Sequence, residues 1–389
     1  MDSTEGLAEH TQLSNWRTHP FNTWSFVNVE ALVPGGTIHR AGPVTSFDPT
    51  TPLDLEAIRL DSGKSAAEAI ADSHTDALVI LDDGQLCNEL YFGYNHRDTR
   101  HLLFSVTKSV TGLLAGILVD EGLLDPSRNV ASYVPELLHS AWGEASVRQV
   151  LDMAVSVDFD EDYLTPDGLL AQYRVAMEWN PPTCFPFKGG LYSFLPLLKA
   201  GPAAPGSVLH YASPTADVLG WVLERASGEK IPELLSTRLW GKLGAQQDAW
   251  ITIDAEGCSR TAGGLCATAL DLARFGEMVR HKGAAQGKEV VPALWIEDIL
   301  QSGNRETWQQ SDLYSLFGSG HYRSQWYMPD QIPGAMIAIG IHGQWLFVDS
   351  KRQVTIAKLS SQPLPEDDQL NAQNLELCDK LAAALASRR

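Results

Sequence analysis

Positive charge is scarce in this chain. Its 389 residues include 29 lysines and arginines against 48 aspartates and glutamates, which gives a formal net charge of −19 at pH 7. Nucleic acids and anionic membrane surfaces attract basic proteins, so this balance argues against both as partners. The chain also lacks any run of about 18 apolar residues, the length that a membrane-crossing helix needs. We therefore expect no binding to nucleic acid and no contact with a membrane.

Cysteine is rare as well. The five cysteines are scattered, form an odd count and include no Cys-x-x-Cys pair: Cys87, Cys184, Cys258, Cys266 and Cys378. That pattern is typical of reduced thiols rather than of a disulfide framework. The amino terminus, Met1 to Glu5, lacks the basic start and the apolar stretch of a secretory signal. Together these absences predict a cytoplasmic protein.

The sequence motifs of several common enzyme classes are missing. There is no His-Glu-x-x-His zinc motif, no Gly-x-Ser-x-Gly elbow and no phosphate-binding loop. Their absence argues against zinc proteases, α/β-hydrolases and nucleotide enzymes. One tight acidic cluster, Asp158, Asp160, Glu161 and Asp162, lacks the spaced ligands and glycine turn of a calcium-type loop. We interpret it as a solvated acidic rim, and we expect neither a metal nor another cofactor.

The chain is longer than one ordinary core requires, yet no low-complexity linker divides it. We expect an irregular N-terminal arm over residues 1–60 and an α/β domain formed by residues 61–122 and 251–389. A mostly helical insertion would span residues 123–250. Alternating or continuous apolar patterns predict a hairpin at 77–92 and strands at 336–341, 344–348 and 353–359, with helices at 267–281 and 369–386.

What the chain does contain is Ser105-Val106-Thr107-Lys108, at the start of a stretch with apolar residues at helical spacing. Residues three apart share one face of a helix, so the amine of Lys108 would lie near the hydroxyl of Ser105. A lysine in a dry pocket can lose its proton and activate a serine as a nucleophile. Ser227 to Lys230 has the same spacing, but it follows a finished helix and we interpret it as a helix end. For Ser105, the pattern alone leaves catalysis and a plain buried helix start equally open.

Several further motifs, in the same order, resemble the serine β-lactamase-like family in its broad branch of esterases, amidases and D-amino-acid peptidases. Residues 120–126 and 134–137 resemble the end of the family's catalytic helix and the loop after it, and residues 263–276 resemble its Gly-Gly-led helix. The resemblance runs from about residue 75 to residue 360. It implies a β-lactamase/DD-peptidase-like fold, an α/β fold of the α+β type with helices flanking an antiparallel sheet beside a mostly helical insertion.

The segment Tyr211-Ala212-Ser213 matches the second element of that family, Tyr-x-Asn or Tyr-x-Ser. The resemblance implies that Tyr211, as tyrosine or tyrosinate, passes a proton between the serine and the leaving group. The segment Tyr322-Arg323-Ser324 has the same Tyr-x-Ser pattern, but no helix is expected after it. After Tyr211, residues 217–226 are expected to form that helix. A buried loop tyrosine is the alternative interpretation of Tyr211.

The family's Lys-Thr-Gly-like strand is best matched by residues 340–344, Gly-Ile-His-Gly-Gln, which include no lysine. In β-lactamases that lysine binds the carboxylate of the drug, so its absence argues against β-lactam hydrolysis and transpeptidation. The resemblance implies an oxyanion hole made by the backbone N–H groups of Ser105 and Ile341, with Gln344 as the alternative register. We assign His342 to the substrate-binding set, with a structural histidine as the alternative.

Within the family, the chain is similar to the 6-aminohexanoate-dimer hydrolases, which act on nylon oligomers. The segments that carry this similarity are 100–103, 148–153, 156–158, 161–163, 211–213, 217–219 and 340–344. It implies that Tyr163 hydrogen-bonds the nitrogen of the scissile amide; a loop tyrosine covering the core is the alternative. Arg174 stands where these relatives hold an aspartate for the ammonium end of the substrate. We expect this cation to disfavour an amine and to favour a carboxylate or a neutral acyl chain.

These residues predict a serine hydrolase for small linear amides or esters. Ser105 would attack the carbonyl, Lys108 would take its proton, Tyr211 would relay it to the leaving group, and water would release the acyl-enzyme. Two alternatives stay open: a carboxylesterase of the same fold with little amidase activity, and a non-catalytic relative that binds ligands. The sequence also leaves a homodimer open. Labelling of Ser105 by a fluorophosphonate would separate an enzyme from a binding protein.

Overall fold

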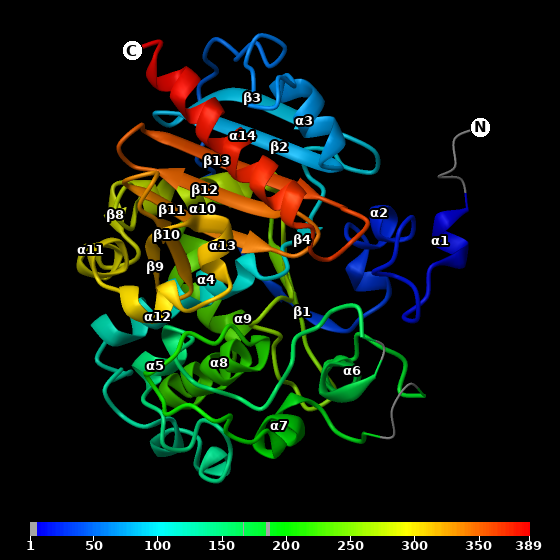
Figure 1. Cartoon of the computed structure of the whole chain (residues 1–389), viewed down its shortest axis with the longest axis vertical. Coiled ribbons are helices and arrows are strands. Elements are labelled where there is room, and N and C mark those ends of the chain that lie inside the picture. Colours follow the sequence, from blue (N-terminus) through cyan, green and yellow to red (C-terminus); the bar gives the residue numbers. More distant parts are fainter. Residues whose placement is uncertain (1–5, 166, 184–186) are drawn as a thin grey trace.

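One antiparallel sheet combines strands from both ends of the chain. The computed structural model describes residues 6–165, 167–183 and 187–389. The sheet has seven strands in the order β3-β2-β13-β12-β11-β10-β9, and neighbouring strands are antiparallel throughout. Their bounds are β2 Thr75–Asp82, β3 Gln85–Tyr91, β9 Gly320–Arg323, β10 Trp326–Pro329, β11 Ala335–Gly340, β12 Gln344–Asp349 and β13 Val354–Ser360. Because β2 pairs with β13, the early and late parts of the sequence form a single body (Figure 1).

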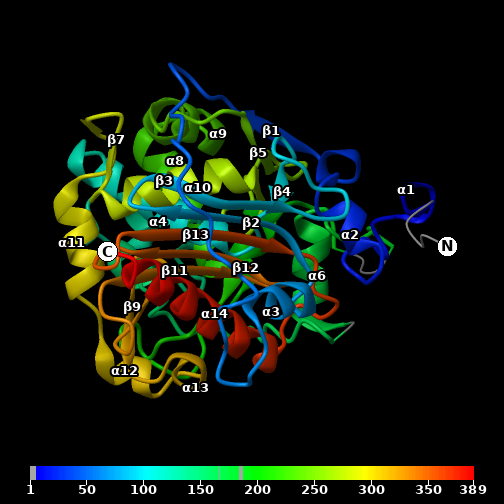
Figure 2. The same ribbon diagram turned by 90° about the horizontal axis from the view of Figure 1, so that it is seen from above.

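Helices cover both faces of this sheet, which confirms the predicted fold class. Helices α3 (Ala66–Asp72) and α14 (Asp368–Ala386) lie on one side, and α10 (Ala269–Arg280) lies on the other (Figure 2). Helix α10 packs closely because Gly276 faces the sheet: a Cβ there would come within 2.5 Å of the Thr355 side chain. The continuous apolar run of β2 is buried between these layers, as expected for a central strand.

A second, smaller sheet positions the nucleophile. Its order is β1-β5-β6-β4, with β1 Gly35–Ile38, β4 His101–Leu102, β5 Ala249–Thr252 and β6 Leu265–Ala267. Strand β4 pairs with β6 and ends three residues before Ser105. Helix α4 (Val106–Asp120) follows at once and is buried along most of its length. Its N-terminus lies where the two sheets meet, because Gly340 of the large sheet packs against the backbone just after β4.

The middle of the chain is mostly helical and lies below the large sheet in Figure 1. It contains α5 Val147–Leu151, α6 Gly168–Ala176, α7 Leu191–Phe194, α8 Ser213–Ser227 and α9 Ile231–Leu234. Helix α8 packs against both α4 and α5. Besides six short η helices, the remaining elements of the described residues are α1 Leu7–His10, α2 Asn22–Ser25, α11 Ala293–Gln301, α12 Arg305–Gln309, α13 Leu313–Phe317, β7 Ala284–Ala285 and β8 Lys288–Glu289.

Two further expectations concern the whole chain. Among the described residues, no helix is both long and apolar enough to cross a membrane. The four described cysteines, Cys87, Cys258, Cys266 and Cys378, are buried free thiols, and Cys184 lies outside the described residues. The domain boundaries given above stay a prediction.

Candidate active site

Ser105 occupies the N-cap position of α4, and its side chain does not cap the helix. Phe104, just before it, has a φ of 45°, a left-handed conformation that is uncommon for a large side chain. This tight turn joins β4 to the helix and brings the Ser105 hydroxyl to the wall of two cavities. Residues in such strained backbone conformations are frequent at functional sites, where the surrounding structure stabilises them.

The amine of Lys108 lies one helical turn farther and is almost completely buried. Its Nζ is 2.7 Å from Ser105 Oγ, 3.0 Å from Ser213 Oγ and 2.8 Å from the carbonyl oxygen of Ala262. Burial lowers the pKa of Lys108 to about 7, although the nearby Glu161 carboxylate acts in the opposite direction. A neutral amine has two N–H groups and one lone pair. It can therefore donate to Ser213 and Ala262 and still accept the proton of Ser105.

Tyr211 completes this group from the loop before α8. The side chains of Ser105 and Tyr327 are close enough to act on the pKa of its hydroxyl, and its ring centroid is 5.0 Å from Lys108 Nζ. Burial raises the pKa of Tyr211 well above its ordinary value, even though Ser105 lowers it in part. The side chain is therefore a neutral phenol at pH 7, which decides between the two forms that the sequence left open.

Glu161 belongs to this site, although the sequence predicted that it lies on a solvated acidic rim. Its carboxylate accepts the Ser213 backbone N–H at 2.6 Å, the Ser213 hydroxyl, and the Tyr163 hydroxyl at 2.6 Å. The neighbouring Asp158, Asp160 and Asp162 are exposed, as a solvated rim requires, but Glu161 is half-buried. No group of acidic, histidine or cysteine side chains in the described part of the chain could hold a metal ion. Nothing in the local sequence separates Glu161 from its neighbours.

The end of strand β11 lies directly against the backbone of the nucleophile. A Cβ at Gly340 would come within 2.9 Å of the Ser105 nitrogen and 2.6 Å of the Leu103 carbonyl, so only glycine fits there. Ile341 follows and lines both cavities beside Ser105. Among the described residues, the N–H groups of Ser105 and Ile341 donate to no acceptor. Two such donors side by side suit an oxyanion.

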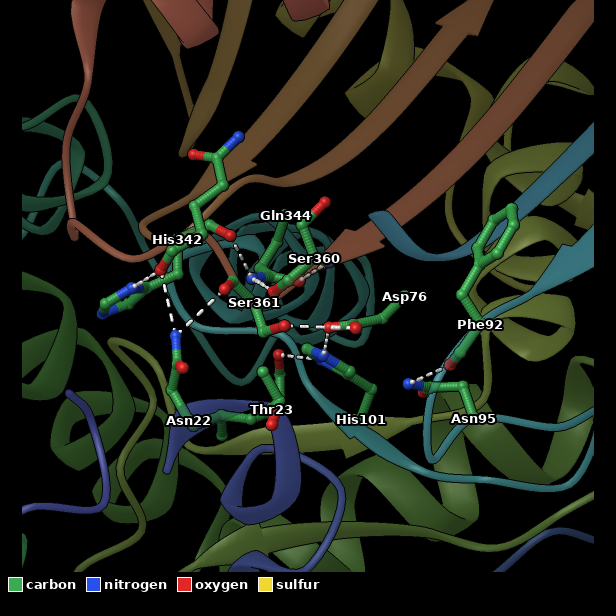
Figure 3. Close-up of polar contacts among 12 residues, drawn as sticks. Asn22, Thr23, Asp76, Phe92, Asn95, His101, His342, Gln344, Ser360 and Ser361 are labelled. Atoms are coloured by element: carbon green, nitrogen blue, oxygen red, sulfur yellow. Dashed lines mark hydrogen bonds and ion pairs between the residues drawn. The ribbon is translucent and has the colours of Figure 1, made fainter. Parts of the chain in front are cut away.

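The alternative assignment, in which Gln344 supplies the second N–H of the oxyanion hole, does not agree with the strand pairing of this hairpin. Gln344 pairs with Gly340 at the start of β12, and its side chain is buried against the neighbouring strand. Its Nε2 donates to the Ser360 carbonyl at 2.7 Å, and its Oε1 accepts the Ser360 N–H at 3.0 Å. Figure 3 shows this pair at the end of β13. Of the two candidates, Ile341 lines the cavities and Gln344 does not.

His342 does not lie in the substrate cavities, which corrects its assignment to the substrate-binding set. The side chain is 2% exposed, its Nδ1 is 2.7 Å from the Gln362 carbonyl, and its ring packs on Phe26 and Phe104. Its φ of 60° closes the turn after Ile341. Asn22 ties the same carbonyl to the N-terminal segment at 3.0 Å (Figure 3). His342 is therefore a structural histidine that supports the Ile341 turn.

A second polar chain in Figure 3 fastens β4 to the large sheet. His101 Nε2 is 3.1 Å from Asp76 Oδ2, and the Ser361 hydroxyl donates to the other oxygen of Asp76 at 3.1 Å. All three side chains are buried. Because β4 leads into Ser105, these hydrogen bonds fix the position of the nucleophile relative to the large sheet.

Tyr163 and Arg174 both lie beside Ser105. Tyr163 lines both cavities, and Arg174 donates from Nη2 to the Tyr163 carbonyl at 3.1 Å. The larger cavity measures about 470 Å³ and includes Tyr211 and Tyr327 in its wall. The smaller cavity measures about 30 Å³ and includes Arg174. The structure thus brings together Ser105, Lys108, Tyr211, Tyr163, Arg174 and Ile341, and leaves out His342.

A buried base beside a serine hydroxyl, a neutral phenol and two convergent N–H donors form a constellation for acyl transfer. The family model of the Beta-lactamase family matches residues 65–378. The chain belongs to this family. It is therefore a member of a family of hydrolases, built on the fold that its motifs predicted.

Individual relatives refine this assignment. The chain is 38% identical over 360 residues to the 6-aminohexanoate-dimer hydrolase of Paenarthrobacter ureafaciens, covering 91% of this chain and 89% of that protein. A solved Bacillus anthracis structure, provisionally named as a 6-aminohexanoate-dimer hydrolase, is 26% identical with a TM-score of 0.87 over 97% and 98% of the two chains. A family VIII carboxylesterase has the same fold at 15% identity, with a TM-score of 0.59 over 86% and 99%. The predicted resemblance to the 6-aminohexanoate-dimer hydrolases is confirmed.

Proposed function

We propose that the protein is a serine hydrolase that cleaves small linear amides or esters through an acyl-enzyme formed on Ser105. The observation that carries the proposal is the 2.7 Å contact between Lys108 Nζ and Ser105 Oγ, with the pKa of the amine lowered to about 7 by burial. A base with this pKa is partly neutral at pH 7 and can accept the serine proton without a large energetic penalty. The 38% identical amide hydrolase supports the amide class.

The chemistry follows from the contacts. Ser105 Oγ adds to the carbonyl carbon while its proton passes to Lys108, and the N–H groups of Ser105 and Ile341 stabilise the oxyanion. Tyr211 donates its proton to the leaving nitrogen or oxygen, and the proton held by Lys108 restores the phenol. Water then attacks the acyl-enzyme, loses its proton to the same base and releases the acid. Ser105 regains its proton at the end of the cycle.

The site holds its polar groups in place for this task. Lys108 has three fixed partners, and Ser213 is fixed in turn by Glu161. Prepositioned groups of this kind need no rearrangement when charge develops in the transition state. A ligand-binding protein without catalysis would not require a lysine of lowered pKa against a serine.

The test compares the 6-aminohexanoate linear dimer with a short p-nitrophenyl ester, using Ser105→Ala as the blank. The chain supplies its own matched control: Ser227 has the same spacing to Lys230, but its hydroxyl donates to the Leu223 carbonyl at a helix end. We expect Ser227→Ala to keep its activity and Ser105→Ala to lose it by at least 10³-fold, and fluorophosphonate to label Ser105 in the native protein. Turnover of the ester without turnover of the dimer or of hexanamide, whose acyl chain carries no charge, would instead indicate a carboxylesterase. An absence of both turnover and adduct would overturn the proposal.

We also infer a cytoplasmic location. Four buried free thiols in the described residues fit a reducing compartment, where disulfides are rare. Fractionation of the native host, followed by detection of the protein, would test this inference directly.

A further inference from the structure

Three arginines from separate parts of the chain line the smaller cavity beside Ser105. Arg17 comes from the segment between α1 and α2, Arg174 from α6, and Arg260 from the loop before β6. The N-terminal segment with α2 and helix α6 lie on the same side of the molecule in both Figure 1 and Figure 2. The three cations are close enough that Arg174 and Arg260 both lower the pKa of Arg17. Nothing local in the sequence links these positions.

Two of these arginines have no carboxylate partner within the described residues. Arg17 donates to the side-chain carbonyl of Asn180, and its buried Nε has no partner. Arg174 donates only to the Tyr163 carbonyl. Arg260, by contrast, is paired with Asp217 and also donates to the Tyr173 hydroxyl. Both side chains are half-buried, and charge that is withdrawn from water is costly unless it is paired, so these two cations leave a place for an anion.

Carboxylates of the protein do not fill this place. Asp217 is committed to Arg260, the Tyr173 hydroxyl and the Ala262 N–H. Glu161, the acidic residue in the wall of this cavity, is held by Ser213 and Tyr163. Asp162 also attracts Arg174, but it lies outside this wall. Within the wall, arginines outnumber carboxylates, which suits an anionic ligand group.

The position of Tyr211 shows which end of the substrate meets these arginines. Tyr211 lies in the wall of the larger cavity and not of the smaller one. Because Tyr211 is the proton donor to the leaving group, the leaving group occupies the larger cavity and the tail of the acyl group enters the smaller one. Five acidic residues line the larger cavity and repel an anion there: Asp160, Glu161, Asp162, Asp312 and Glu366. A negative charge on the substrate is therefore directed towards the arginines.

The size and walls of the smaller cavity fit the charged end of a substrate rather than a whole chain. Its volume of about 30 Å³ has room for about two water molecules, or for the two oxygens of a carboxylate. Leu170, Met177 and Phe104 are apolar members of the same wall and suit the methylene groups next to that carboxylate. Arginine is well suited to the far end, since its planar guanidinium can bind both oxygens of a carboxylate.

We propose that Arg17 and Arg174 form a carboxylate subsite for the acyl half of the substrate, with Arg260 adding positive charge to the same wall. The preferred substrates are then half-amides or half-esters of linear dicarboxylic acids, whose free carboxylate reaches the arginines while Ser105 attacks the other end. An ammonium group in the same place is repelled. This proposal rests on the proposed function and names its substrate class.

The test uses three p-nitrophenyl esters with one leaving group and six-carbon acyl chains that end in a carboxylate, a methyl group or an ammonium group. We expect kcat/KM to fall in that order, with about tenfold or more between the carboxylate and the methyl ester, the scale of a charged hydrogen bond. In Arg174→Gln and Arg17→Gln, the ratio of carboxylate to methyl ester falls towards one, and Arg174→Lys restores part of it. Arg225→Gln is the matched control, because Arg225 is an exposed arginine paired with Glu136. Equal rates for the carboxylate and methyl esters in the native protein would overturn the subsite.

A binding measurement keeps this test independent of turnover. On Ser105→Ala, calorimetry compares 5-carbamoylpentanoate, the half-amide of adipic acid, with hexanamide. We expect the carboxylate compound to bind at least tenfold more tightly, and the difference to vanish in Ser105→Ala/Arg174→Gln. If no ester is turned over while this difference persists, the proposed function fails and the subsite stands. If esters are turned over without any difference in rate or binding, the subsite alone is wrong.

Discussion

The backbone N–H of Ser213 donates to the Glu161 carboxylate at 2.6 Å, and the Ser213 hydroxyl donates to the same group. With its hydrogen pointed at Glu161, that hydroxyl presents a lone pair to Lys108 Nζ, 3.0 Å away. An orientation of this kind leaves the Lys108 lone pair directed at Ser105 once the amine is neutral. Glu161 is thus a positioning residue that acts on the base through Ser213.

Replacing Glu161 by glutamine should affect both rate and pH dependence. The amide cannot accept all three protein hydrogen bonds as the carboxylate does, so we expect kcat to fall roughly tenfold or more. Glu161 also holds the pKa of Lys108 upward, and its neutralisation should move the acidic limb of the pH profile to lower pH. Steady-state kinetics from pH 5.5 to 9 measure both effects. Asp158→Asn, at an exposed neighbour that lines neither cavity, is the control. A profile for Glu161→Gln that is reduced but not shifted would contradict the electrostatic part.

Lys108 sets the pH dependence of the native protein. The base must be neutral to accept the Ser105 proton, and burial lowers its pKa to about 7. The value of kcat/KM should therefore rise with pH through about 7 as a single ionisation and level off above it. Lys230→Ala, at the motif of equal spacing, should leave this profile in place, whereas Lys108→Ala abolishes turnover. Rates that do not vary between pH 5.5 and 8.5 would be inconsistent with Lys108 as the base.

Tyr211 distinguishes leaving groups that need a proton from those that do not. An amide nitrogen must be protonated to leave, but p-nitrophenolate leaves as an anion. Tyr211→Phe should therefore lower amide turnover by about 10²-fold or more and ester turnover by much less. Tyr322→Phe removes a comparable buried hydroxyl, bonded to Gln325 at 3.3 Å, and serves as the control. Equal losses for both substrates would assign Tyr211 to activation of Ser105 instead.

Local patterns in the sequence were sufficient for the elements that carry the site. A continuous apolar run followed by an Asp-Asp-Gly turn predicted the hairpin that forms β2 and β3, and helical periodicity predicted α4 and α14 close to their observed bounds. The spacing of Ser105 and Lys108 predicted their contact because a helix brings residues three apart onto one face.

Tertiary placement decided the rest. Arg17, Arg260 and Glu161 reach the cavities through loops, so no periodicity identifies them. The pairing of Gly340 with Gln344 fixed the register that the motif alone left between Ile341 and Gln344. His342 has the composition of a site residue, but the left-handed turn that it occupies points its ring into the core.

Lys358, a buried lysine away from the nucleophile, should govern part of the stability. It lies on β13 with no exposed surface, its Nζ donates to the Ser360 hydroxyl at 2.6 Å, and burial lowers its pKa to about 7 from 10.5. Below pH 7 the folded protein must bury the charged amine, so this lysine destabilises the fold. Above pH 7, the Lys358 amine of the folded protein is neutral, whereas the same amine in the unfolded chain keeps its proton up to about pH 10. The free energy of unfolding therefore rises with pH, by about 1.4 kcal/mol per pH unit for one proton.

Lys358→Met should raise stability at pH 6 to 7 and remove one proton from the number taken up on unfolding. Lys108 has the same lowered pKa and retains its own contribution, so the slope of stability against pH should fall by about half rather than vanish. Urea unfolding at several values between about pH 7 and 7.8 measures this slope, because ordinary thiols, with a pKa of about 8.5, are still mostly protonated there. Lys351→Met, at an exposed position of the same hairpin, should keep the native slope. A slope for Lys358→Met equal to that of the native protein would show that Lys358 keeps its charge in the folded sheet.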